Sequence, residues 1–223
     1  MHALIGARHK LAAALVGISL LATAGHAAPV IEAGDLHQHA QSPTGGDARS
    51  ANNDVHRSLA QYLIPKVSLI RDDAIKVDLP AELDDGRPVV LNFIYTSCTT
   101  ICPLSSQTFE QFQEHLGTAH EPVHLVSISI DPEQDTPARL RAYAAQFHAQ
   151  PGWDHYSGTL AAVLTVQKAF HAYFGDKMSH TPLTLVRAAP GKPWVRFDGF
   201  ARVDELLGER NSWLSPPASL AAK

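Results

Sequence analysis

Hydrophobic residues gather into two nearly continuous runs in the middle of the chain. The first extends from Val89 to Tyr95 and the second from Val123 to Ile130. Runs of this kind are typical of strands that are buried on both faces, as in parallel sheets. After the first run, apolar residues recur at helical spacing at Phe109, Phe112 and Leu116. This alternation of strand and helix predicts an α/β domain with parallel strands.

The predicted helices have recognisable ends. Pro103 suits the first position of one helix, and Gly117 is a typical stop for it. Thr136 is a typical helix cap because its hydroxyl accepts a backbone N–H bond, and Pro137 then takes the first helical position. A third helix is expected from Thr159 to Phe174.

Shorter apolar segments complete the pattern. Val67 to Ile70 and Lys76 to Leu79 predict an N-terminal β-hairpin. Leu183 to Val186 and Trp194 to Phe200 predict a second hairpin across the turn-rich segment AAPGKP, before a short helix from Val203 to Leu207. We therefore expect a central mixed β-sheet flanked by helices, and the closing β-β-α order is typical of thioredoxin-like domains.

The N-terminus has the pattern of an export signal. Arg8 and Lys10 precede an apolar run from Leu11 to Ala24 and small residues after it. The run is shorter than the roughly 20 residues that cross a bilayer. We expect cleavage after Ala27 and a soluble periplasmic protein, with tethering by an uncleaved segment as the alternative. The predicted division is a signal peptide (1–27), a flexible polar leader (28–61), the folded domain (62–208) and a proline-containing tail (209–223).

Charge and cysteine content narrow the function. The net charge of −4 becomes −6 when the signal peptide, with Arg8 and Lys10, is removed, so nucleic acid is not an expected partner. The two cysteines of the chain lie in one motif, CTTIC, at Cys98 and Cys102. Structural disulfides of exported proteins normally join distant elements, which a four-residue step does not do. The pair is therefore a candidate for chemistry.

Cys98 and Cys102 follow a central strand and begin a helix, where ligands bind in open α/β sheets. The positive end of the helix lowers a thiol pKa, and the thiolate serves as metal ligand or nucleophile. Cysteines at this spacing accept a metal or, after a small distortion, form a disulfide. Two soft thiolates are too few for tetrahedral zinc and favour copper(I), whereas an added imidazole also accommodates copper(II).

A histidine is needed to complete a copper site. His180 lies just before the strand that begins at Leu183, in a loop that faces the cysteines in a thioredoxin-like sheet. We predict it as the third ligand. His37 and His39 belong to the polar leader and are interpreted as solvated rather than as a copper-capture pair. The other histidines of the domain are interpreted as surface or packing residues: His115, His120, His124, His148, His155 and His171.

Three motifs occur in an order that resembles the Sco (SenC) family: YTSCTTICP, SISIDPEQDTPARLRAYAAQF and MSHTPLTLV. The resemblance covers about Tyr62 to Gly208. It implies a thioredoxin-like fold, copper bound by Cys98, Cys102 and His180, and a role in maturing the dinuclear copper centre of cytochrome c oxidase. The implied partners are the copper-receiving subunit of that oxidase and another periplasmic copper donor. A metallochaperone is then expected rather than a turnover enzyme.

Some positions keep other interpretations open. Pro182 matches the cis-proline position that faces the cysteines in thiol oxidoreductases, so a reductase of a copper-receiving protein is the alternative function. Ser179 stands where many Sco relatives have an acidic residue. Asp131 is a candidate to orient a ligand, whereas Asp135 is interpreted as structural. A peroxidase-like function is disfavoured because nothing resembles a peroxidatic cysteine with its supporting arginine.

Overall fold

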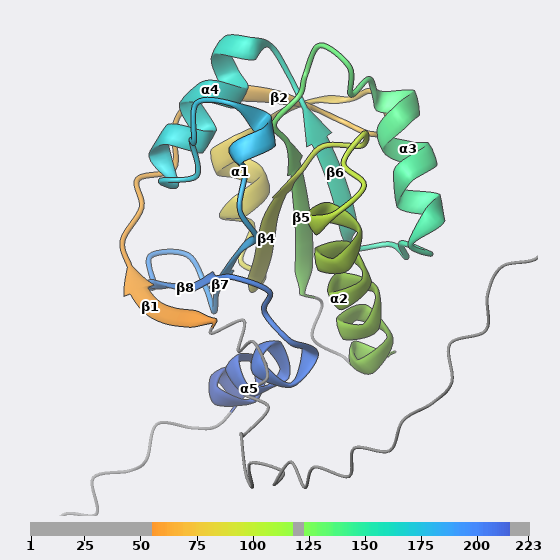
Figure 1. The fold of residues 1–223 in the computed structure, drawn as a ribbon. Coiled ribbons are helices and arrows are strands. Elements are labelled where there is room, and N and C mark those ends of the chain that lie inside the picture. Colours follow the sequence, from red (N-terminus) through yellow and green to blue (C-terminus); the bar gives the residue numbers. More distant parts are fainter. Residues whose placement is uncertain (1–54, 118–122, 215–223) are drawn as a thin grey trace, which may run out of the picture. The chain divides into compact units, whose positions relative to one another are not determined.

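The computed structural model describes residues 55–117 and 123–214, and these residues contain one eight-stranded mixed sheet (Figure 1). The strand order is β1-β8-β7-β4-β5-β6-β2-β3. The strands are β1 (His56–Ala60), β2 (Ser68–Arg71), β3 (Lys76–Asp78), β4 (Val89–Ile94), β5 (His124–Ser129), β6 (Trp153–Ser157), β7 (Leu183–Arg187) and β8 (Trp194–Asp198). The helices are α1 (Leu79–Leu83), α2 (Ile101–Leu116), α3 (Pro137–Gln146), α4 (Leu160–Ala169), the 3₁₀ turn η1 (Lys177–Ser179) and α5 (Val203–Leu214).

The centre of the sheet is formed by β4 and β5, which pair in parallel and are buried along their whole length. β6 extends the parallel part, and β7 pairs antiparallel with β4. Both predicted hairpins are present, since β2 pairs antiparallel with β3 and β7 with β8. The predicted mixed α/β sheet is therefore confirmed.

Helices cover both faces of the sheet, with α2, α3 and α5 on one face and α1 and α4 on the other (Figure 1). Alternate β4 residues supply the two cores. Val90 and Ile94 pack with the α2 residue Phe109, whereas Leu91 and Phe93 belong to the opposite core. The second core is completed by residues of α1 and α4: Leu79, Leu83 and Val166.

Local chemistry accounts for several helix ends. The Thr136 hydroxyl accepts a bond of 3.3 Å from the Arg139 N–H, and Pro137 opens α3 as predicted. Gly117 ends α2 with φ of 54°, a backbone conformation that glycine adopts without strain. α2 begins at Ile101, two residues before the predicted start at Pro103, so that Cys102 lies in its first turn.

The folded region is longer than the predicted 62–208. β1 lies within the segment predicted as a flexible leader, 28–61, and pairs antiparallel with β8 through backbone hydrogen bonds that need no apolar pattern. At the other end α5 continues to Leu214, into the predicted tail. The signal peptide, His37 and His39 lie outside the described residues.

Two further differences concern the third helix and its surroundings. α4 ends at Ala169 rather than Phe174, and the chain turns at His171 with φ of 51°. The strand β6 and the short helix α1 were not predicted. β6 was missed because its sequence WDHYS is short and polar, although most of it is buried. Among the described helices, none is both long and apolar enough to cross a bilayer.

Candidate functional site

The CTTIC motif connects the carboxyl end of β4 to the first turn of α2. Both cysteines are free thiols and both are nearly buried, with exposed fractions of 6% for Cys98 and 1% for Cys102. The Cys98 N–H donates to the Tyr95 carbonyl at 3.1 Å, which turns the chain directly after β4. The two thiols thus lie at the edge of the sheet where ligands bind in open α/β folds.

The Cys98 sulfur lies among hydrogen-bond donors. The Cys102 N–H, in the first turn of α2, points at it from 3.4 Å. Burial raises the pKa of Cys98, but backbone N–H bonds from Cys102 and Thr100 and a bond from the Tyr95 hydroxyl outweigh burial and lower this pKa to about 7. Cys98 therefore carries a substantial thiolate fraction at neutral pH.

Cys102 has the opposite electrostatics. Burial raises the pKa of its thiol, and the negative charges of Cys98 and Asp135 raise it further. Cys102 is thus protonated at neutral pH until a metal or a disulfide removes its proton. The pair consists of one thiolate and one buried thiol.

The Asp135 side chain connects the residues before the CTTIC motif to β5 by hydrogen bonds. Its carboxylate accepts hydrogen bonds from the Thr96 N–H and hydroxyl and from the Ser129 hydroxyl, the two hydroxyl bonds each being 2.6 Å long. Asp135 is 1% exposed. This structural role agrees with the interpretation of Asp135 from the sequence, although the bonds reach the cysteine loop and not only the start of α3.

His180 follows the turn η1 and is 7% exposed. Its Nε2 lies 3.1 Å from the Phe93 carbonyl, and its ring packs edge-on against Phe174 with centroids 6.0 Å apart. Its Nδ1 is buried without a hydrogen-bond partner. Burial lowers the pKa of His180, against the effect of the Phe93 bond, which favours the neutral imidazole that binds metals.

The structure does not bring the three predicted ligands together around one point. In the part of the chain that is described, the one group of three or more His, Cys, Asp or Glu residues with ligand atoms all within 4.8 Å of one another is Glu82, His124 and Asp154. Cys98, Cys102 and His180 do not meet that distance. Joint binding of one ion by these three residues therefore requires their ligand atoms to come closer together than they are here.

The two candidates for supporting roles have different contacts. The Asp131 carboxylate is 2.5 Å from Lys177 Nζ, so it holds the loop three residues before His180 and acts on the histidine only through that loop. The Pro182 carbonyl accepts the Gly199 N–H at 2.9 Å, which joins the residue before β7 to the residue after β8.

Tyr95 and Met178 are residues of the site that sequence reasoning missed. The Tyr95 hydroxyl donates to Met178 Sδ at 3.8 Å, and Tyr95 also helps to lower the pKa of Cys98. Burial, followed by the interaction with Cys98, raises the pKa of Tyr95 to about 12. A search for further soft sulfur atoms near the motif would have found Met178, because it lies two residues before His180.

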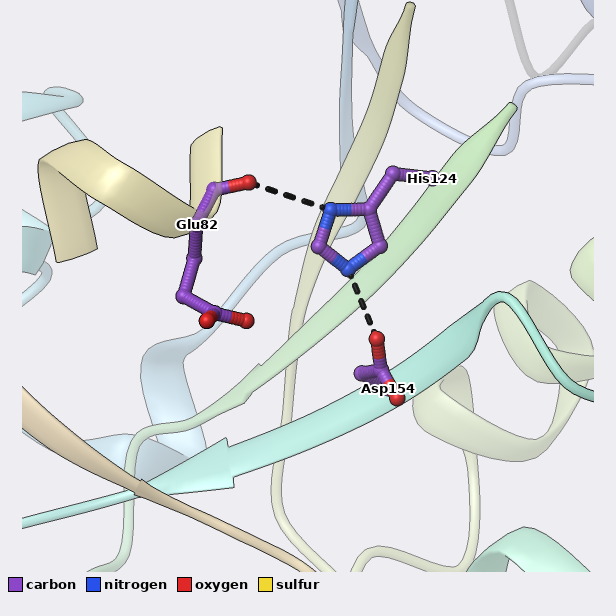
Figure 2. Close-up of side chains that lie close together, drawn as sticks. All are labelled: Glu82, His124 and Asp154. Carbon is purple, nitrogen blue, oxygen red and sulfur yellow. Dashed lines mark hydrogen bonds and ion pairs between the residues drawn. The ribbon is translucent and has the colours of Figure 1, made fainter. Parts of the chain in front are cut away.

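The group of Glu82, His124 and Asp154 lies at the opposite edge of the sheet, where β5 begins (Figure 2). His124 Nδ1 faces the Glu82 carbonyl at 3.2 Å, and Nε2 faces Asp154 at 2.9 Å. The Tyr156 hydroxyl donates to the Glu82 carboxylate at 2.6 Å. Hydrogen bonds within the protein occupy both ring nitrogens of His124, so this network is explained as a structural one, and it is separate from the cysteines.

Comparisons with known proteins identify relatives of this chain. The family model described as SCO1/SenC matches residues 77–210. The SCO1 protein homolog of Bacillus subtilis is 34% identical over 74 residues, which are 33% of this chain and 38% of that relative's length.

Two solved structures share the fold. Copper-bound ScoI of Arabidopsis thaliana superposes with a TM-score of 0.57 at 25% identity, covering 68% of this chain and 98% of that one. BsSco, described as a member of the Sco family of cytochrome c oxidase assembly proteins and as containing a disulfide switch, has a TM-score of 0.59 at 23% identity, covering 70% and 95%.

Proposed function

Because this chain belongs to the SCO1/SenC family, we propose that it is an exported copper metallochaperone whose cargo is bound at the CTTIC motif. The observation that carries the proposal is the pairing of a Cys98 thiolate with a second thiol at the carboxyl edge of the sheet. Thiolate sulfur is a soft ligand of the type that favours copper(I). The proposed ligands are Cys98, Cys102 and His180.

The chemistry of the three residues fits copper. Hydrogen bonds from the Cys102 and Thr100 N–H groups stabilise a negative charge on Cys98 before a cation arrives. The buried Nδ1 of His180 has no partner, so one imidazole nitrogen remains available while Nε2 faces Phe93. Binding of a metal through Nδ1 would leave the contact between Nε2 and the Phe93 carbonyl in place.

The proposed acceptor is the copper-receiving subunit of cytochrome c oxidase, with a second periplasmic copper donor upstream. Support for this acceptor comes from the description of the related BsSco, which assigns it to cytochrome c oxidase assembly proteins. The export of this chain is proposed from its N-terminal pattern of Arg8, Lys10 and the following apolar run. Both steps go beyond the domain that the structure describes.

A copper titration tests the ligand set. The purified protein is reduced and titrated with copper(I) or copper(II), and stoichiometry and absorption spectra are compared for wild type, Cys98→Ser, Cys102→Ser and His180→Ala. His171→Ala is the matched control, because His171 is an exposed histidine after α4. We expect one copper per chain in wild type and the control and impaired binding in the other three. Binding by His180→Ala that equals wild type in both copper states would remove His180 from the site.

The contrast between the two thiols favours a second candidate function, thiol-disulfide exchange. The Cys98 thiolate would attack a partner disulfide, and Cys102 would then resolve the mixed disulfide, leaving Cys98–Cys102 oxidised and the partner's two thiols reduced. The pKa of about 7 at Cys98 matches the attacking role. The reduced protein should then reduce a disulfide in the copper-receiving protein, and Cys98→Ser should abolish the reaction. No reduction by wild type would eliminate this function.

A further inference from the structure

The loop that carries His180 also carries Met178, whose side chain lies near the CTTIC motif. Met178 Sδ lies 3.8 Å from the Tyr95 hydroxyl. The Tyr95 carbonyl accepts the Cys98 N–H at 3.1 Å, so the same residue adjoins the cysteine motif. Tyr95 therefore lies between Met178 and the cysteine motif. The His180 ring, in contrast, is directed toward the Phe93 carbonyl and Phe174.

The position of Met178 is held by its neighbours. The Met178 N–H donates to the Asp176 carboxylate at 3.0 Å and begins the turn η1. Lys177 pairs with Asp131 at 2.5 Å and lies 5.7 Å from the centre of the Tyr95 ring. The backbone of Met178 is thus fixed against both the end of β5 and the end of β4.

The side chain itself is free to turn. Met178 is 74% exposed, so packing does not explain its apolar side chain at this place. A methionine side chain has three rotatable bonds and a polarisable sulfur, which together let it reach a nearby ligand by rotation alone. Thioether sulfur, like thiolate sulfur, selects copper(I) over harder cations.

We propose that Met178 is a copper(I) ligand that acts with Cys98 and Cys102 while the loop keeps the arrangement seen here. The inference rests on the proposed function, because it requires that the two cysteines bind copper. It assigns the loop two alternative ligands. Met178 serves copper(I) in the present arrangement, and His180 serves the site once its free Nδ1 approaches the cysteines.

The proposal predicts a difference between the two copper oxidation states. A thioether is a poor ligand for copper(II) compared with imidazole, so loss of Met178 should weaken copper(I) binding selectively. Because substitutions next to a metal ligand already cost about 10–100-fold in affinity, loss of a direct ligand should cost at least about tenfold. Met178→Leu preserves the side-chain volume and keeps the exposed position apolar.

The test combines a direct structural signal with affinity. The chain contains two methionines, Met1 and Met178, so selenomethionine labelling places one selenium atom at the site. X-ray absorption at the copper edge of the reduced, copper(I)-loaded protein should show a copper–selenium distance, and labelled Met178→Leu should not. Copper(I) affinity, measured against a chelator, should fall at least tenfold in Met178→Leu while copper(II) affinity is unchanged.

Two outcomes overturn the proposal and can be told apart. If no selenium signal appears and Met178→Leu binds copper(I) as wild type does, while Cys98→Ser loses binding, Met178 is not a ligand but the proposed function stands. If Cys98→Ser and Cys102→Ser also bind as tightly as wild type, the cysteine site fails and the Met178 ligand fails with it. Circular dichroism of each variant checks that the fold is kept.

Discussion

Lys177 Nζ lies 2.5 Å from the Asp131 carboxylate, and this ion pair joins the loop that carries His180 to the chain directly after β5. The Lys177 side chain is 39% exposed, so solvent screens the pair and its contribution to global stability is small. Its effect is expected to be local. The pair holds the loop in the arrangement that places Met178 near Tyr95.

Asp131→Asn should therefore loosen this loop without unfolding the domain. The change removes the charge that attracts Lys177 and keeps the side-chain shape. We expect faster amide hydrogen exchange in residues 175–182, measured by mass spectrometry, and a melting temperature close to that of wild type. Glu133→Gln is the control, because it removes an exposed acidic charge from the same segment. Equal exchange in both variants would show that the ion pair does not restrain the loop.

Alkylation of the reduced protein should distinguish the two cysteines. Cys98 has a pKa of about 7 and reacts as a thiolate, so its rate with iodoacetamide should rise with pH and reach half of its maximum near pH 7. Cys102 should react slowly throughout, because burial raises its pKa and covers its sulfur. Cys98→Ser should abolish the fast phase, whereas Cys102→Ser should keep it. A fast phase that survives in Cys98→Ser would contradict this assignment.

The parts of the fold that were predictable are those in which each segment carries its own signal. β4 and β5 are buried on both faces, and this requires the continuous apolar runs that are seen in the sequence. β6 carries no such signal, because Trp153 and Asp154 find their partners on β5. Trp153 donates to the Ser127 hydroxyl, and Asp154 pairs with His124. These contacts are known only after the strands have been placed.

The same distinction holds at the site. The cysteines were identified by their spacing and position after a strand. The direction of the His180 ring depends on the turn η1 and on the ion pair of Lys177 with Asp131, and both are tertiary features. Met178 was missed because sequence reasoning looked for an imidazole in this loop and did not weigh a thioether two residues away.

Stability should fall in acid through His155. The side chain is fully buried, stacks on Trp153 with centroids 5.1 Å apart, and has a pKa lowered to about 4 by burial. In the unfolded chain the pKa is about 6.5, so between these values only the unfolded state binds the proton. His155 therefore lowers the free energy of unfolding as pH falls from about 6.5 to about 4, by at most about 1.4 kcal/mol per pH unit.

His155→Phe should remove this dependence and keep the aromatic packing. Urea unfolding at several pH values measures the difference between variant and wild type, which should grow in favour of the variant below about pH 6.5. His171→Phe is the control, because it makes the same substitution at an exposed position. A difference that is independent of pH would show that His155 is protonated equally in both states.

Asp135→Asn should lower the free energy of unfolding of the domain and increase the reactivity of the Cys102 thiol. The carboxylate accepts from two hydroxyls and from the Thr96 N–H, and an amide offers only one accepting oxygen, so a buried donor loses its partner at a cost of about 1–3 kcal/mol. The lost negative charge also lowers the pKa of Cys102, because Asp135 is one of the groups that raise it. Ser129→Ala removes one of the hydrogen bonds and keeps the charge, so it should reduce the free energy of urea unfolding without speeding Cys102 alkylation. Faster alkylation in both variants would attribute the reactivity of Cys102 to loosened packing rather than to charge.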